Sequence, residues 1–224
     1  MAGTRSSEPW PPADRDVIPD APARLPGKPP RLRREQPDAI WRLHKEADPN
    51  RPRRYPRGRW RFDAPNGEYL VTYGNVSKHH AFAEVFGDVD GPQIIEGASG
   101  RRLSCATFKR PLQIVDLGDA RVLRALRLDL RVSTTIDYAR TMRWSERLHA
   151  WLPDADGIRY LGRKGGREDN YCLFLDRCAD ALEWTFHGDL AANEELVLEV
   201  GEMFELAFDF TVRKASDTPP PRWP

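Results

Sequence analysis

The stretch from Arg59 to Phe86 contains the densest set of chemically useful side chains in the chain. Two arginines, Arg59 and Arg61, open it, and a carboxylate, Glu84, lies near its end. Guanidinium groups bind anions through forked N–H donors, and a carboxylate can stabilise positive charge or orient a nucleophile. By itself, the Glu84 carboxylate is equally compatible with a solvated surface group.

A strand must hold the aromatic part of this stretch. The turn at 65–67, Pro-Asn-Gly, is followed by the alternating run 69–73, Tyr-Leu-Val-Thr-Tyr. Such a run predicts a strand. Because strand side chains alternate between faces, Tyr69 and Tyr73 are expected on one face together with Val71.

A short helix must position the carboxylate. Ser77 is a suitable N-cap, and Gly87 ends the helix predicted over 78–86. The apolar side chains of this segment share one stripe, and Glu84 projects on the other side.

The composition limits the classes of protein that the chain can belong to. Its 35 Lys and Arg residues nearly balance 34 Asp and Glu, giving a formal charge of +1, so no whole-molecule attraction to nucleic acid or acidic membranes is expected. The three cysteines, Cys105, Cys172 and Cys178, have no CxxC spacing, which indicates neither a disulfide framework nor a metal site. No apolar run reaches the roughly 20 residues of a membrane span. A soluble, cytoplasmic protein without metal is therefore expected.

The length of 224 residues suits one domain. Proline-rich residues 1–37 are predicted to be a disordered tail, 38–212 the domain, and 213–224 a second disordered tail. Further strands are expected at 39–44, 112–117, 158–161, 171–175 and 182–186, and further helices at 119–126, from Ser133 or Thr134 to Pro153, and at 192–207. Short strands and helices mixed without regular βαβ spacing predict an α+β fold, a curved and mainly antiparallel sheet flanked by short helices.

Three basic segments lie outside the opening stretch. The cluster at 31–34 reads as a solvated tail more readily than as a nucleic-acid contact. The proline-rich loop at 48–58 has the composition of an anion-recognition loop. The glycine-rich run at 162–166 suits either a phosphate contact or an ordinary mobile turn.

Four motifs in order resemble the RES domain family, named for an Arg, a Glu and a Ser. They are Trp41-Arg42-Leu43; Arg61-Phe62-Asp63 followed by Pro65 and Gly67; Tyr73 ahead of the run at 81–86; and the run at 156–160 followed by Gly162, Arg163 and the Phe174 strand. The resemblance covers about Ile40 to Phe210. It implies a fold similar to ADP-ribosyltransferase toxins. It also implies a toxin-like activity that cleaves the nicotinamide-ribose bond of NAD with inorganic phosphate or water as acceptor, without a cofactor, and a small antitoxin protein as partner.

The resemblance also implies roles for individual residues. Arg42 would be the family arginine and Glu84 the family glutamate, both catalytic. Substrate binding would fall to Arg61, Tyr73, Tyr69, Gly162 and Arg163. Forked guanidinium donors suit pyrophosphate or an acceptor phosphate, and a tyrosine ring can stack on nicotinamide.

The family serine is replaced by Gly162. A glycine gives no hydroxyl hydrogen bond to a ligand, although its backbone amide remains. If the missing hydroxyl limits activity, Gly162→Ser should raise turnover. The alternative is a non-catalytic nucleotide-binding or protein-interaction module of the same fold. The sequence does not fix the oligomeric state.

Overall fold

The structure is a computed structural model that describes residues 17–45, 58–87, 94–96, 100–163 and 168–209. Its strands are β1 (Arg33–Glu35), β2 (Ile40–His44), β3 (Val71–Asn75), β4 (Ile94–Glu96), β5 (Arg102–Phe108), β6 (Leu112–Asp116), β7 (Gly157–Leu161), β8 (Asp169–Phe174), β9 (Leu182–Asp189) and β10 (Ala207–Asp209). Its helices are α1 (Lys78–Phe86), α2 (Ala120–Leu126), α3 (Arg131–Thr134), α4 (Tyr138–Trp151), α5 (Leu175–Cys178) and α6 (Glu194–Phe204), with 3-10 turns η1 (Ala179–Ala181) and η2 (Leu190–Ala192).

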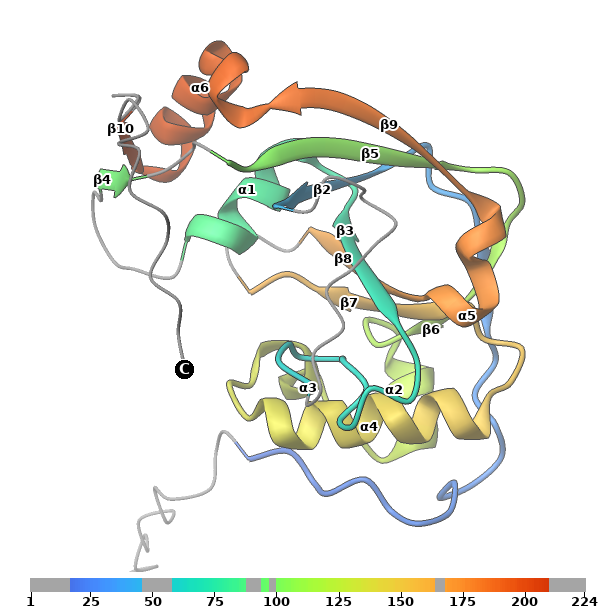
Figure 1. Cartoon of the computed structure of the whole chain (residues 1–224). Helices are drawn as coiled ribbons and strands as arrows, with labels where there is room; N and C mark the ends of the chain where they lie inside the picture. Colours follow the sequence, from blue (N-terminus) through green and yellow to red (C-terminus); the bar gives the residue numbers. More distant parts are fainter. Residues whose placement is uncertain (1–16, 46–57, 88–93, 97–99, 164–167, 210–224) are drawn as a thin grey trace, which may run out of the picture.

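Eight strands form one sheet in the order β1-β6-β7-β8-β3-β2-β5-β9. Neighbouring strands are antiparallel except β6 and β7, which are parallel. Figure 1 shows the sheet curling so that β5 and β9 lie opposite β6 and β7, with α2, α3 and α4 grouped below it and α1 and α6 at its upper end. The predicted α+β fold with a curved, mainly antiparallel sheet is therefore confirmed.

The helices attach to the sheet through apolar side chains that are almost completely buried. Trp144 and Leu148 of α4 belong to a cluster that also contains Phe174 of β8. Phe82 of α1 and Val200 of α6 lie in a separate cluster at the other end of the sheet. Full burial of one such side chain contributes on the order of 1.5–3 kcal/mol. Within the described residues, no helix is long and apolar enough to cross a membrane.

Helix α1 has the boundaries that its capping residues predicted. The Ser77 hydroxyl accepts a hydrogen bond from the backbone N–H of His80 at 3.3 Å, as an N-cap does. At the other end, the N–H of Gly87 donates to the Ala83 carbonyl at 2.7 Å. The helix therefore starts and stops where the sequence indicated.

Other local expectations are wrong in detail. Helix α4 begins at Tyr138 because the Asp137 side chain caps it, accepting from the N–H of Arg140 at 3.1 Å, so Ser133 lies in the separate short helix α3. Strand β3 begins two residues later than expected, at Val71. The seven-residue strand β5, which pairs with both β2 and β9, was not predicted.

The N-terminal segment is another correction. Residues 17–37, for which the sequence predicted disorder, pack against the domain. Ile18 is fully buried in the cluster below the sheet, and the Trp144 indole N–H donates to the Pro19 carbonyl at 2.8 Å. The prolines interrupt the regular spacing of apolar residues in this segment, but they do not prevent it from packing on the domain. Residues 1–16 and the predicted tail at 213–224 lie outside the described residues.

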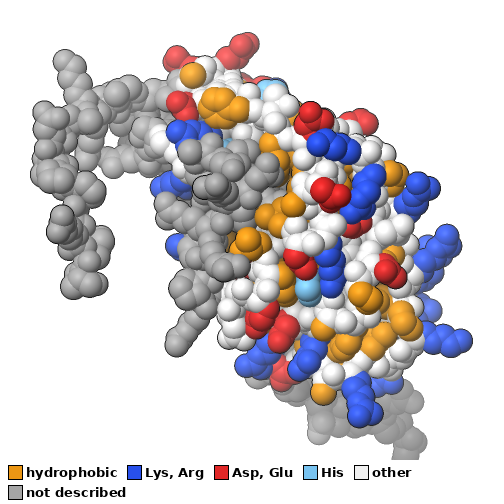
Figure 2. Space-filling model, turned by 45° about the vertical axis from the view of Figure 1, so that its right-hand side comes forward, with side chains coloured by type: hydrophobic (Ala, Val, Ile, Leu, Met, Phe, Trp, Pro, Cys, Tyr) orange, Lys and Arg blue, Asp and Glu red, His pale blue; other side chains and the backbone are white. Residues whose placement is uncertain are grey.

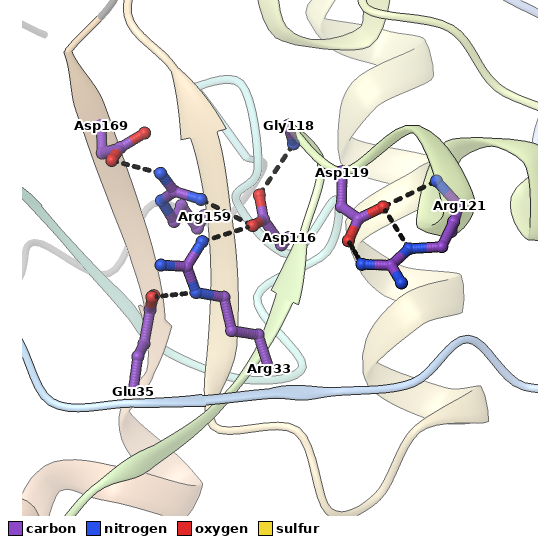
Figure 3. A network of polar contacts seen from close by, with 8 residues as sticks. All are labelled: Arg33, Glu35, Asp116, Gly118, Asp119, Arg121, Arg159 and Asp169. Atoms are coloured by element: carbon purple, nitrogen blue, oxygen red, sulfur yellow. Dashed lines mark hydrogen bonds and ion pairs between the residues drawn. The ribbon is translucent and has the colours of Figure 1, made fainter.

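A network of ion pairs fastens β1 to the sheet (Figure 3). The Asp116 carboxylate of β6 accepts from Arg33 of β1 at 3.0 Å and from Arg159 of β7 at 2.6 Å. Arg159 also pairs with Asp169 of β8, and Arg33 with Glu35 at 2.7 Å. Because Asp116 is almost fully buried, removing either arginine would leave its charge undercompensated.

Ile18→Ala is expected to lower the free energy of unfolding by about 2–5 kcal/mol, since it opens a cavity in a packed core. Chemical denaturation monitored by circular dichroism measures this loss. Val17→Ala is the matched control, because Val17 is 41% exposed and its truncation should change stability by about 0.5 kcal/mol or less. Equal stability of the two variants would show that residues 17–37 are not part of the folded unit.

Candidate active site

A cavity of about 470 Å³ lies between β2, β3, α1 and the adjoining ends of β7 and β8. The described residues that line it include six cations, Arg42, Lys45, Arg59, Arg61, Arg101 and Arg163, and a single carboxylate, Glu84. The aromatic residues among them are Trp41, Trp60, Tyr73, Tyr138 and Tyr160. This excess of positive charge, combined with flat rings, favours an anionic ligand that carries planar groups.

The Glu84 carboxylate is held in place by N–H donors from two directions. Its Oε1 atom accepts from the backbone N–H of Arg163 and from the Asn170 side-chain amide, both at 3.0 Å. The Asn75 side-chain amide donates in turn to the side-chain oxygen Oδ1 of Asn170 at 2.9 Å, and the Asn75 side-chain oxygen accepts from the N–H of Ser77 at 2.7 Å. Both asparagines are buried. The carboxylate is thus tied to β3, β8 and the start of its own helix.

Gly162 lies directly against this carboxylate. A Cβ atom at position 162 would be 2.8 Å from Oε1 of Glu84 and 3.0 Å from Nδ2 of Asn170. The first distance is shorter than real Cβ contacts, so a side chain at 162 would require the flexible end of Glu84 to shift from its present position. This crowding predicts that Gly162→Ser lowers turnover, the opposite of the expectation drawn from the resemblance, and only activity measurements decide between the two.

Arg61 combines a structural contact with a place in the cavity wall. It is only 7% exposed, it donates to the Thr135 carbonyl, and its guanidinium lies 5.1 Å from the centre of the Tyr138 ring. Burial lowers the pKa of the guanidinium; nearby Arg163 lowers it further, and Glu84 opposes this shift. The group is still protonated at neutral pH, so a permanent positive charge faces the cavity.

Arg42 lines the same cavity from β2. The ladder between β2 and β3 consists of one pair, Trp41 with Asn75, and Arg42 adds a side-chain bond from Nη1 to the Thr72 hydroxyl at 2.8 Å. This contact fixes the arginine at the junction of the two strands.

The two predicted tyrosines have different positions. Tyr73 lines the cavity, and its hydroxyl donates to the Asp63 carboxylate at 2.9 Å. Tyr69 is not among the residues around the cavity. Its hydroxyl is 2.8 Å from the Ser145 hydroxyl, and its ring stacks on His149 with 4.0 Å between the ring centres. Tyr69 is therefore a core residue, and its predicted contact with substrate has no geometric support.

Tyr160 and Asn170 are site residues that the sequence analysis did not select. Burial raises the pKa of the Tyr160 phenol well above its usual value, and the Glu84 carboxylate raises it further, so the phenol stays neutral beside Glu84. Asn170 faces Tyr160 across the β7–β8 ladder. The alternation of side chains along β7 and β8 could have indicated that Tyr160 and Asn170 share a face of the sheet. This alternation identifies a particular pair of residues only once the register of the two strands is known. Of the predicted anion-recognition segments, 46–57 and 164–167 lie outside the described residues.

Fold and cavity together define an α+β domain with a cationic, aromatic-lined cleft around one fixed carboxylate. The chain belongs to the RES domain family, whose sequence pattern matches residues 39–198, so the resemblance inferred from the motifs is confirmed. A chain in the crystal structure of the M. tuberculosis MbcT-MbcA toxin-antitoxin complex is similar, with a TM-score of 0.49 and 12% identity over 74% of this chain and 91% of that chain. No curated protein matches the chain significantly.

Proposed function

We propose that the protein is a toxin-like enzyme that cleaves the nicotinamide-ribose bond of NAD, with phosphate or water as acceptor. The main support is the position of Glu84, whose carboxylate is held by Arg163 and Asn170 inside a cationic cavity. A solvated surface glutamate has water as its partner, whereas Glu84 accepts two N–H donors, one of which, Asn170, is itself held by buried Asn75. The carboxylate is thus preorganised to act on a ligand in the cavity.

The charges of the cavity suit the diphosphate of NAD. Arg42 and Arg61 project from β2 and from the turn before β3 and carry forked donors that match phosphate oxygens. The cavity volume of about 470 Å³ lies within the usual range for small-molecule sites.

The chemistry needs little more than a carboxylate and a positioned acceptor. The nicotinamide nitrogen of NAD is positively charged, so the C1′–N bond breaks with both electrons passing to the ring, and nicotinamide leaves neutral without a proton. The ribose then carries oxocarbenium-like positive charge, which Glu84 stabilises. An oxygen of phosphate or water forms the new C1′–O bond. When water attacks, Glu84 is the group that takes its proton.

Proton NMR of NAD incubated with the purified protein, in phosphate buffer and in phosphate-free buffer, tests the proposal. Free nicotinamide is the expected product. Its formation in phosphate alone would identify phosphate as acceptor, and equal formation in both buffers would identify water. Intact NAD in both buffers, with a protein shown to be folded, would contradict the proposal; calorimetric binding of NAD without product would then favour the binding module.

The proposal also includes action in the cytoplasm, where NAD is abundant, and restraint by a small antitoxin protein. Expression of the chain alone is expected to deplete NAD and to stop growth, whereas Glu84→Gln is expected to leave both unchanged. Growth arrest by both proteins would indicate toxicity by another route.

Nucleic acid is not part of the proposal. Over the face shown in Figure 2, Lys and Arg side chains are interspersed with Asp and Glu and do not form one basic patch. Binding that depends on phosphate contacts requires clustered cations. The cations gathered in the cavity are better placed for a small ligand.

A further inference from the structure

One exposed aromatic side chain belongs to the cavity and is not used by the proposed chemistry. Trp60 is 46% exposed, and of the large hydrophobic side chains exposed in the described residues it is the one that lines the cavity. Exposing an indole to water is unfavourable. An indole at the wall of a ligand cavity gains stability when a flat apolar surface covers it.

The backbone around Trp60 is held by hydrogen bonds to one buried carboxylate. One carboxylate oxygen of Asp63 accepts from the N–H groups of Arg59 and Trp60, both at 2.8 Å, and its other oxygen accepts from the Tyr73 hydroxyl at 2.9 Å. Asp63 is itself 92% buried, being 8% exposed. The exposed indole therefore projects from a turn that is anchored to β3, and it would lose little backbone entropy when a ligand binds.

Positive charge flanks the indole. The Arg59 guanidinium lies 5.1 Å from the centre of the Trp60 ring. Arg61, the next residue along the chain, is buried in the same cavity wall. An aromatic platform beside a guanidinium group, in a cavity lined by further cations, matches a nucleotide, in which a flat base is joined through ribose to phosphate.

We propose that Trp60, supported by Arg59, is a stacking platform for the adenine base of NAD, an inference that rests on the proposed function. The platform makes the enzyme select the dinucleotide over nicotinamide mononucleotide, which lacks the adenosine half. Trp60 thus contributes to binding and specificity, and Glu84 to bond cleavage.

Steady-state kinetics with NAD and with nicotinamide mononucleotide test this assignment. Trp60→Ala is expected to raise the KM for NAD about tenfold with kcat nearly unchanged, because a lost base-aromatic stack weakens binding by about that factor. Cleavage of nicotinamide mononucleotide should be unchanged. Trp60→Phe should retain most of the affinity, since a smaller ring still stacks. Phe186→Ala is the control, because Phe186 is 57% exposed on β9, outside the cavity.

Calorimetry with AMP tests the platform without turnover. Wild type should bind AMP, and Trp60→Ala should bind it about tenfold more weakly. AMP binding that is absent from wild type or unaffected by Trp60→Ala would overturn the assignment, as would equal losses for NAD and nicotinamide mononucleotide. If wild type binds AMP through Trp60 but cleaves no NAD, the proposed function fails while the nucleobase site stands. If wild type cleaves NAD and Trp60→Ala does so equally well, the proposed function stands while the nucleobase site fails.

Discussion

Glu84→Gln is expected to lower kcat for NAD cleavage by at least about 100-fold, the usual cost of removing one preorganised electrostatic contact with a transition state. Glutamine keeps the size of the side chain and an oxygen that can accept from Arg163 and Asn170. It removes the negative charge that stabilises the developing oxocarbenium ion. The rate of nicotinamide release at saturating NAD measures kcat, and therefore the contribution of the Glu84 negative charge to bond cleavage.

Binding and folding should survive this substitution. AMP affinity and the midpoint of thermal unfolding are expected to remain close to wild type. Glu183→Gln is the matched control, because Glu183 is exposed on the edge strand β9, outside the cavity, and should keep full activity. Activity of Glu84→Gln within a few fold of wild type would show that the carboxylate is not catalytic.

Gly162→Ser is expected to lower turnover by about tenfold or more. Its Cβ would lie 2.8 Å from Oε1 of Glu84, so the carboxylate must shift relative to the donors on Arg163 and Asn170, which weakens those hydrogen bonds. Hydrogen bonds to a charged group contribute about 1.5–3 kcal/mol each, and one such contact corresponds to roughly a tenfold change in rate or more.

Gly162→Ala separates the two effects of serine, because alanine adds the Cβ without the hydroxyl. If crowding of Glu84 is the cause, the alanine and serine variants should lose activity alike, with KM for NAD less affected than kcat. Serine activity well above that of alanine would show that a hydroxyl at 162 can act as it is expected to act in the family. Turnover of Gly162→Ser above wild type would contradict the crowding argument.

Local sequence chemistry predicted parts of the fold with good accuracy. Helix α1 has the predicted bounds because Ser77 and Gly87 satisfy its end groups within a few residues. Tyr69 and Val71 belong to one core cluster, against which Tyr73 packs, so the three side chains share a side as predicted although β3 itself begins at Val71. The segment at 17–37 was mispredicted because its order depends on distant partners such as Trp144, and no local periodicity records such a contact.

The candidate site was predicted in part by motif order. The structure places Glu84, Arg42, Arg61, Tyr73 and Arg163 around one cavity, and their catalytic and binding roles stay predictions. The sequence could not separate Tyr69 from Tyr73. Tyr69 precedes β3 and meets α4 through Ser145, whereas Tyr73 lies within β3 and lines the cavity.

The sequence by itself determined the RES family motifs, the α+β class and the short helix that carries Glu84, because these depend on residue order, periodicity and capping over short distances. Only the tertiary structure shows which groups surround Gly162. Its neighbours Glu84 and Asn170 lie 78 positions before it and eight after it in the chain, and antiparallel register together with the curl of the sheet brings them within 3.0 Å of a Cβ at that site. In the fold, Gly162 lies against the Glu84 carboxylate, and a side chain at this position would crowd that carboxylate.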